Sequence, residues 1–380
     1  MRFLFIIQGE GRGHFTQALA LQQILQQKGD TLCAVLVGKS SHRQLPAFFT
    51  TKIDAPVYTF ESPNFLPTPQ NKRPPLLKSL FFNLGKLPEF QKSIKFIHRK
   101  ICDLQPDLVI NFYELLTGLT YLFKSPPYPL ICIGHQYLFL HKDFQFPPAS
   151  RLELFFLRFF SRITAIGAVQ KFALSFYDFP QDPQHQITVI PPLLRKEIFD
   201  FAPVSRDFLL GYLLNSGYAS EITQWQAQHP VPPLHFFWDQ KEAPRQLEIN
   251  SHFHLHKIDD TSFLQYMVNC KAYATTAGFE SVCEALYLQK PVLMVPVHIE
   301  QKCNAWDAQN VGAGISASRF DLDSLLNFIP LYRPNPVFKR WAQSAPSRIY
   351  PLLEANRLKP KSPPIKFAYV LAKFSDYSPK

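Results

Sequence analysis

The chain opens with an apolar run, a glycine-rich loop and a stretch of helical spacing. Met1–Ile7 is mostly apolar, and Gly9–His14 follows it directly. Within Ala18–Leu25, apolar residues recur three and four positions apart, which predicts a helix with one buried face. Leu32–Val37 is a second apolar run of strand length. This order of strand, glycine loop, helix and strand predicts the opening of a parallel α/β sheet.

The same alternation of apolar runs and helical stretches continues along most of the chain. Further strands are expected at Leu108–Asn111, Leu130–Ile133, Ile163–Ala165, Ile187–Ile190, Phe208–Leu214, Leu234–Trp238, His252–Ile258, Ala272–Thr275 and Val292–Val295. Helices are expected between them at Leu115–Phe123, Leu152–Phe160, Ser262–Asn269, Phe279–Leu288 and Lys302–Asn310. Strands that alternate with helices in this way are typical of doubly wound α/β domains.

The length and the proline pair Pro191-Pro192 divide the chain in two. A chain of 380 residues, 46% of them hydrophobic, is too long for one ordinary core. We therefore predict an α/β protein with two Rossmann-like doubly wound domains that face each other across a cleft. The expected divisions are a first domain at 1–190, a linker at 191–206, a second domain at 207–332 and a tail at 333–380.

Composition excludes several classes of protein. No apolar run reaches the ~18 residues that a membrane span needs, and the run at the N-terminus is too short for a secretory signal. The six cysteines are far apart and form no Cys-x-x-Cys pair, which favours free thiols in a reducing compartment over disulfides or a zinc site. We expect a cytoplasmic protein.

The net charge of +11 is unevenly distributed. It is +8 over residues 1–190, −5 over 191–332 and +8 over 333–380. A basic first half favours an anionic partner, which could be nucleic acid, lipid headgroups or a phosphorylated substrate. Solubility alone is the alternative explanation.

The N-terminal loop, Gly9-Glu10-Gly11-Arg12-Gly13-His14, is the first candidate site. It differs from a dinucleotide fingerprint, because His14 replaces the third glycine, and from a Walker A loop, because no Gly-Lys-Ser/Thr follows. Gly11 and Gly13 permit a tight turn into the helix. A histidine at that helix start can act as a general base, with Glu10 as a nearby acid. A capping histidine without a chemical role is the alternative.

The second candidate site begins where the strand at Ala272–Thr275 runs into small residues. A helix is expected to start near Gly278, where its dipole favours a phosphate and the missing side chain lets a ligand approach. Glu280 and Glu284 lie four residues apart on one face of this helix, and a carboxylate there can accept two ribose hydroxyls.

The next strand carries polar residues to the same edge of the sheet. Lys290–Pro296 is followed by His298, Glu300 and Gln301, and Asn304 comes on the helix after them. An acid and an amide side by side at the end of a strand suit hydrogen bonds to sugar hydroxyls.

Residues 272–312 resemble the donor-site region of GT-B glycosyltransferases, especially family 28. That family includes the bacterial enzyme that adds N-acetylglucosamine to a lipid-linked peptidoglycan precursor. The resemblance lies in three linked segments: Gly278…Glu284-Ala285, Lys290-Pro291…Pro296 and Glu300-Gln301…Asn304-Ala305. The Gly-x-Gly-x-Gly-His loop is similar to the acceptor-side loop of the same enzymes. One departure is Asn215-Ser216-Gly217-Tyr218, which lacks the run of glycines common after the first strand of the donor domain.

The resemblance implies roles for these residues. Gly278 would approach the diphosphate, Glu284 would hold the ribose, and Glu300 and Gln301 would hold the donor sugar. Thr276, Phe279, Glu280, His298 and Asn304 complete the expected donor site. Gly11, Gly13 and His14 would lie on the acceptor side. The resemblance also implies a UDP-linked donor, inversion at the anomeric carbon, a C-terminal helix that crosses back to the first domain, and no metal or cofactor.

Weaker signals come from single residues at predicted strand ends. Glu114 and His135 each follow a strand of the first domain, so we expect both at the cleft, Glu114 as a catalytic candidate and His135 on the acceptor side. His252, His254 and His256 alternate as metal ligands can, but alternation with a buried Phe253 and Leu255 gives the same pattern. Asp321-Leu322-Asp323 matches a metal motif of another glycosyltransferase fold, although a helix cap is the favoured explanation.

The stretch Lys72–Lys100 is basic and aromatic. It carries eight Lys or Arg residues and one acid, Glu89, interleaved with apolar residues. Such a stretch can lie on an anionic membrane, or it can be a helix packed on the core with a basic outer face. We do not expect nucleic-acid binding, because no recognition motif accompanies the charge.

The sequence thus favours a glycosyltransferase that moves a sugar from a nucleotide-sugar to a hydroxyl of an acceptor. A lipid-linked acceptor at the inner face of the membrane would fit the basic, aromatic first domain. Two alternatives remain open: an epimerase or hydrolase of nucleotide-sugars with the same fold, and a non-catalytic protein that binds nucleotide-sugar or anionic lipid. The sugar, the nucleotide, the acceptor and the oligomeric state also stay open.

Overall fold

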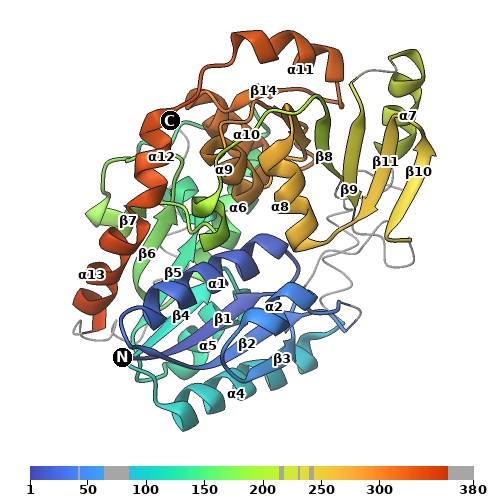
Figure 1. The fold of residues 1–380 in the computed structure, drawn as a ribbon. Helices are drawn as coiled ribbons and strands as arrows, with labels where there is room; N and C mark the ends of the chain where they lie inside the picture. The colour runs from blue at the N-terminus through green and yellow to red at the C-terminus, as the bar shows by residue number, and fades with distance from the viewer. Residues whose placement is uncertain (42, 64–84, 214–217, 230–231, 239–243, 358–380) are drawn as a thin grey trace.

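The computed structural model describes residues 1–41, 43–63, 85–213, 218–229, 232–238 and 244–357. It contains two seven-stranded sheets, one formed by the first half of the chain and one by the second. Figure 1 shows them as two stacked units, with helices of both meeting between the sheets. The predicted α/β class with two sheets is confirmed.

The first sheet is wholly parallel and has the order β3-β2-β1-β4-β5-β6-β7. Its strands are β1 (Arg2–Gln8), β2 (Thr31–Lys39), β3 (Val57–Glu61), β4 (Leu108–Phe112), β5 (Leu130–Gly134), β6 (Ala168–Leu174) and β7 (Ile187–Ile190). Its helices are α1 (Arg12–Gln26), α2 (Ala47–Lys52), α4 (Leu87–Leu104), α5 (Leu115–Lys124) and α6 (Arg151–Thr164), with short 3₁₀ turns η1 (His135–Leu140), η2 (Pro183–His185) and η3 (Lys196–Asp200). The central strands β4 and β5 are buried throughout, as expected for a sheet covered on both faces.

The second sheet has the order β10-β11-β9-β8-β12-β13-β14. Its strands are β8 (Leu209–Leu213), β9 (Leu234–Trp238), β10 (Gln246–Asn250), β11 (Phe253–Lys257), β12 (Ala272–Thr275), β13 (Val292–Met294) and β14 (Gly314–Ser316). Its helices are α7 (Ala219–Gln228), α8 (Asp260–Asn269), α9 (Phe279–Tyr287), α10 (Ile299–Asn310) and α11 (Leu322–Phe328), followed by η5 (Ile329–Leu331). Only the edge strand β10 pairs antiparallel among the strands described.

One predicted strand is wrong. Ile163–Ala165 forms the end of α6 and the turn after it, and the strand of this region is β6 instead. The run was too short to distinguish a strand from the buried end of a helix, because Thr164 and its neighbours are apolar or small in either case.

The C-terminal helices α12 (Pro336–Gln343) and α13 (Ala345–Arg357) follow the second sheet and reach the first. The indole Nε1 of Trp341 donates to the carbonyl of Ser175, just after β6, at 2.9 Å. Arg348 forms an ion pair with Asp178 at 3.2 Å. The tail as far as residue 357 therefore packs on the first domain, and residues 358–380 lie outside the described part.

The basic stretch Lys72–Lys100 falls partly on residues that the structure describes. From Leu87 onward it is α4, whose residues Phe90, Ile94 and Ile97 are buried against the core of the first domain. This part of the stretch is a packed helix. Residues 72–84, and with them part of the predicted membrane surface, lie outside the described residues.

No helix among the described residues is long and apolar enough to cross a membrane. The six cysteines are free thiols, and Cys132, Cys270, Cys283 and Cys303 are buried.

Candidate functional site

The two domains meet where α1, from the first glycine loop, lies against α9, which follows β12. Gly13, in the first turn of α1, faces Glu280 in the first turn of α9. A Cβ atom added to Gly13 would lie 2.1 Å from Oε2 of that carboxylate, so a larger residue there would displace the end of the Glu280 side chain. The sequence predicted these residues in separate sites, and the structure brings them together.

Glu280 is bound across the domain boundary. The side-chain amide of Gln17 on α1 donates a hydrogen bond to its Oε1. Burial raises the pKa of Glu280 to about 7, and the bond from Gln17 opposes that rise. Glu280 is therefore an acid that can exchange a proton near neutral pH at the contact between the domains.

His14 lies beside this contact. Its ring is buried and stacks on Tyr113 with 6.0 Å between the ring centroids, and its Nδ1 has no hydrogen-bond partner. Burial lowers the pKa of His14, which the nearby carboxylate of Glu300 opposes. A neutral imidazole with an unpartnered nitrogen is suited to accept a proton.

Glu300, in the first turn of α10, belongs to the second domain and interacts with groups of both domains. Its Oε1 accepts a hydrogen bond of 2.9 Å from the amide of Gln136 on η1, in the first domain. Burial lowers the pKa of His298, the residue that precedes α10, and the nearby charge of Glu300 opposes that shift. The carboxylate therefore faces groups of both domains.

His135 is packed rather than open. Its ring stacks on Phe279 with centroids 4.0 Å apart, and its Nδ1 lies 2.7 Å from the carbonyl of Leu174. Burial lowers the pKa of His135 to about 4. Its Nε2 faces Oδ2 of Asp307 on α10 at 4.0 Å, and burial raises the pKa of that carboxyl to about 7. At neutral pH His135 is therefore uncharged, whereas Asp307 is close to half protonated.

Glu114 and Glu10 belong to a separate cluster at the end of the first sheet. Glu114 caps α5, and its Oε1 accepts bonds from the Ser62 hydroxyl at 2.6 Å and the Leu116 amide at 3.0 Å. Its Oε2 has no partner, and burial raises the pKa of Glu114 to about 7. Glu10 accepts a bond of 2.8 Å from the amide of Ser40. Both carboxylates hold loops of the first domain in place.

The remaining predicted donor residues shape the backbone of the second domain. Gln301 accepts a bond of 3.0 Å from the amide of Val297, and the amide of Asn304 donates to the carbonyl of Ala277 at 3.1 Å. Thr276 is buried in the same turn. Gly278 begins α9, and a Cβ there would have only Ser281 Oγ nearby, at 3.6 Å. The start of α9 is thus accessible from one side.

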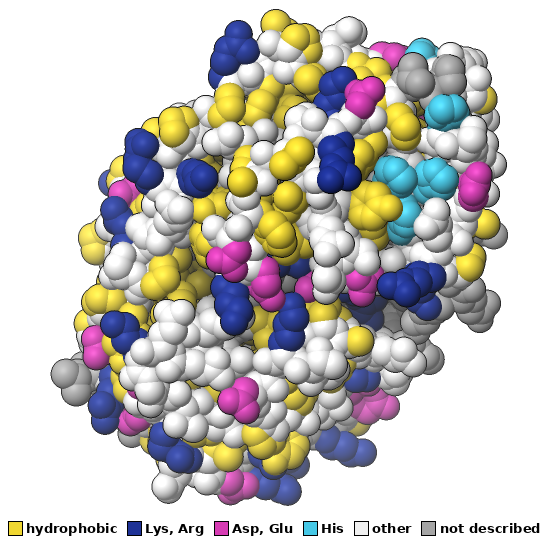
Figure 2. All heavy atoms as spheres, viewed as in Figure 1, with side chains coloured by type: hydrophobic (Ala, Val, Ile, Leu, Met, Phe, Trp, Pro, Cys, Tyr) yellow, Lys and Arg dark blue, Asp and Glu magenta, His cyan; other side chains and the backbone are white. Residues whose placement is uncertain are grey.

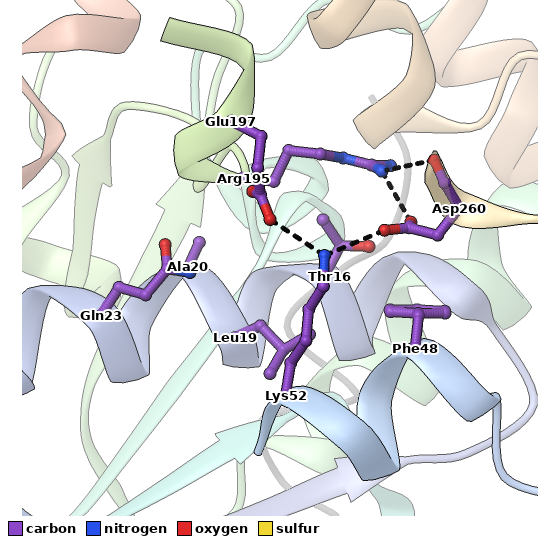
Figure 3. Close-up of a pocket in the computed structure, with 9 residues that line it drawn as sticks. All are labelled: Thr16, Leu19, Ala20, Gln23, Phe48, Lys52, Arg195, Glu197 and Asp260. Carbon is purple, nitrogen blue, oxygen red and sulfur yellow. Dashed lines mark hydrogen bonds and ion pairs between the residues drawn. The ribbon is translucent and has the colours of Figure 1, made fainter. Parts of the chain in front are cut away.

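Glu284, the residue expected to hold ribose, is paired with a cation. Its Oε1 accepts a 2.5 Å bond from Nε of Arg195, whose Nη1 donates at 2.6 Å to Asp260. Burial raises the pKa of Glu284, and the guanidinium opposes that rise. Lys52 on α2 bridges Glu197 at 2.9 Å and Asp260 at 3.2 Å, so this ion network also connects the two domains (Figure 3).

Lys52, Arg195, Glu197 and Asp260 of this network line a small depression that opens to solvent. Figure 2 shows acidic and basic side chains gathered in the middle of this face, between its upper and lower halves. The other residues that line the depression are Thr16, Leu19, Ala20, Gln23 and Phe48, all of the first domain.

Sequence reasoning missed Arg195, Gln17, Gln136 and Asp307. Arg195 lies in the segment that was interpreted only as a linker, although an arginine five residues after a strand end was a usable signal. The other three lie on the buried sides of elements, and only the packing of the two domains shows that they face the candidate site.

The weaker signals have structural explanations. Asp321 caps α11 by accepting from the Ser324 amide at 3.1 Å. His254 and His256 lie on β11, where Phe253 and Leu255 point into the core. Within the described ranges, no group of three or more His, Cys, Asp or Glu side chains is arranged to hold a metal ion. Asn215–Gly217, where glycines were missing, lie outside the described residues.

Comparison with known proteins gives the family. The family described as "Glycosyl transferase family 1" matches residues 1–331. No curated protein sequence matches the chain significantly.

Solved structures show the same fold at low sequence identity. CalG4, the calicheamicin glycosyltransferase, is 16% identical with a TM-score of 0.61, covering 94% of this chain and 99% of its own. Acinetobacter baumannii MurG is 16% identical with a TM-score of 0.53, covering 93% and 99%. Arabidopsis thaliana UGT89C1 complexed with UDP is 14% identical with a TM-score of 0.59, covering 98% and 99%. The resemblance to GT-B glycosyltransferases is confirmed: the chain belongs to glycosyl transferase family 1 and has the GT-B fold.

Proposed function

We propose that this glycosyltransferase moves a hexosyl or N-acetylhexosaminyl group from a UDP-sugar to an acceptor hydroxyl at the contact between its domains. The observation that carries the proposal is the contact between the domains beside His14, where Gln17 of the first domain bonds to Glu280 and Gln136 bonds to Glu300. A transferase that binds its acceptor on one domain and its donor on the other needs side chains of both domains at the point where the substrates meet. The Arabidopsis relative complexed with UDP supports the choice of nucleotide.

The donor would lie along the second domain. The accessible start of α9 at Gly278 offers backbone N–H groups and a positive dipole end to the diphosphate. Glu284 would accept the ribose hydroxyls once Arg195 turns from it toward the phosphates. Glu300 and Gln301 would bind the sugar. Binding therefore requires the Arg195–Glu284 pair to rearrange.

The acceptor hydroxyl would attack from the side of the first domain. Its oxygen forms a bond to the anomeric carbon while the bond from that carbon to the diphosphate oxygen breaks, and UDP leaves with the electron pair. His14 accepts the hydroxyl proton, because its imidazole is neutral and one nitrogen is unpartnered. Attack opposite to the leaving group inverts the anomeric centre. Glu10 and Glu114 would position the loops around His14.

We also propose that the reaction needs no metal and that the acceptor is lipid-linked, used at the cytoplasmic face of a membrane. The start of α9 and Arg195 would stabilise the leaving diphosphate in place of a cation. The basic first domain, with a net charge of +8 over residues 1–190, supports an acceptor on an anionic surface.

The test is a panel of nucleotide-sugars screened for thermal stabilisation of the pure chain. Each hit is then assayed for nucleotide release with and without lipid extract, and with and without EDTA. Stabilisation by a UDP-sugar with lipid-dependent, EDTA-insensitive release is the expected result. Release that ignores lipid would identify a hydrolase, and no stabilisation by any nucleotide would overturn the donor site.

A further inference from the structure

Helix α6 carries an aromatic outer face. Leu152, Phe155 and Phe156 are 64%, 48% and 53% exposed, which is unusual for side chains of this size. The ring of Phe155 contacts those of Phe156 and Phe159, with centroids 5.6 and 5.9 Å apart. We call Leu152, Phe155, Phe156 and Phe159 the α6 face. Their spacing of three and four residues places them on one side of the helix.

The opposite side of α6 is firmly packed. Leu157, Ser161 and Thr164 are buried, and the Ser161 hydroxyl lies 2.7 Å from the hydroxyl of Tyr113. The helix is therefore held in place by its inner side, and the exposure of the α6 face is not a consequence of a loosely placed element.

The charges on α6 are mostly basic. The helix carries Arg151, Arg158 and Arg162 against one acid, Glu153. The guanidinium of Arg158 lies over the ring of Phe146 at 5.8 Å, so this cation is held at the helix surface. A second copy of this chain, with its net charge of +11, would be repelled by such a surface. Aromatic side chains among arginines fit an anionic phospholipid surface, where rings enter the interface and guanidinium groups bind phosphates.

The α6 face is also connected to the candidate site. Tyr113, which bonds to Ser161 on the inner side of α6, stacks on His14. A helix that rests on a membrane by its outer face would therefore hold the acceptor side of the site about one helix diameter, ~10 Å, from the lipid headgroups.

We infer that the α6 face is a docking surface for anionic phospholipid. The inference rests on the proposed function for its biological purpose, since a lipid-linked acceptor is presented at such a surface. It concerns a different surface from the stretch Lys72–Lys100.

The test is co-sedimentation of the full chain with vesicles of phosphatidylglycerol and phosphatidylcholine, and with vesicles of phosphatidylcholine alone. The double variant Phe155→Ser/Phe156→Ser removes two of the four side chains of the α6 face, both of them about half exposed. The matched control is Leu331→Ser/Val337→Ser, which removes two side chains that are 68% and 60% exposed elsewhere. Thermal unfolding checks that both variants keep the fold.

We expect binding to the anionic vesicles only, reduced about tenfold or more by Phe155→Ser/Phe156→Ser and unchanged by the control. Three results would overturn the inference: no binding by the unaltered chain, equal binding to both vesicles, or equal binding by the Phe variant. Self-association that the Phe variant abolishes would assign the face to a second copy instead. Donor-dependent stabilisation is measured without vesicles, so a failure here leaves the glycosyltransferase proposal standing.

Discussion

Arg195 and Glu284 form a 2.5 Å ion pair although one lies in the connection between the sheets and the other on α9. The pair is mostly buried, with 14% and 2% of the two side chains exposed. Removing one partner of a buried pair leaves an uncompensated charge, whereas an apolar replacement of both is often tolerated.

Arg195→Met should therefore lower the free energy of unfolding by about 3 kcal/mol, because it leaves the Glu284 carboxylate buried without its cation. Urea denaturation at neutral pH measures this loss. The double variant Arg195→Met/Glu284→Leu should recover most of the stability while still failing to bind donor. A single Arg195→Met variant of unchanged stability would show that the pair is not needed for folding.

Glu284→Gln should weaken UDP-sugar binding about tenfold or more, because an amide cannot accept both ribose hydroxyls as a carboxylate does. Isothermal titration with the UDP-sugar identified in the screen measures this effect. Glu354→Gln, an exposed acid on α13, is the matched control and should bind as the unaltered chain does.

His14→Ala should lower kcat by about 10²–10⁴ and leave the KM for the donor nearly unchanged, since the imidazole acts on the acceptor proton. Steady-state kinetics with varied donor separate the two constants. A large rise in the donor KM at constant kcat would instead place His14 in donor binding.

The stability of the chain should depend on pH through Glu114, whose pKa burial raises from the usual 4.5 to about 7. The folded state keeps the Glu114 proton to a higher pH than the unfolded state does. The stabilisation that comes from the protonated carboxyl is therefore complete below about pH 4.5 and is lost as the pH rises to about 7. The Glu114→Gln side chain cannot ionise. Over that pH range the free energy of unfolding of this variant should fall by about 1–3 kcal/mol less than that of the unaltered chain. Parallel urea curves at several pH values test this, and identical pH dependence of both proteins would contradict it.

Two glycines should differ in their tolerance of alanine. At Gly118 a Cβ would lie 1.9 Å from the backbone carbonyl of Ile163, which cannot move without shifting α6. At Gly13 the obstacle is the end of the Glu280 side chain, which can swing away at the loss of its bond to Gln17. Gly118→Ala should cost about 3 kcal/mol of stability and Gly13→Ala about 1 kcal/mol. Thermal unfolding of both variants makes the comparison.

Local patterns predicted the two sheets well, because buried parallel strands are continuous apolar runs with glycine or proline at their ends. Where a run was short, as at Ile163–Ala165, helix and strand patterns coincide and the prediction was wrong. The edge strand β10 was not predicted: Leu247 and Ile249 alternate with polar residues, but the run is only five residues long and all of it is exposed.

Sequence patterns predicted the two parts of the candidate site, one from each domain, but not the contact between them. The loop at Gly13 and the segment at Glu280 each carry a local signal, but no pattern within either indicates that they touch. The position of Arg195 five residues after a strand end was a usable signal, but its partner could not be predicted, because Glu284 belongs to the other domain.

The chain crosses between the domains twice, once after β7 and once before α12, where Trp341 is anchored to Ser175. Two connections between the domains restrain twisting and sliding of one domain against the other more than a single linker would. The C-terminal helices therefore add a second restraint on how the two domains are held together, beside the linker after β7.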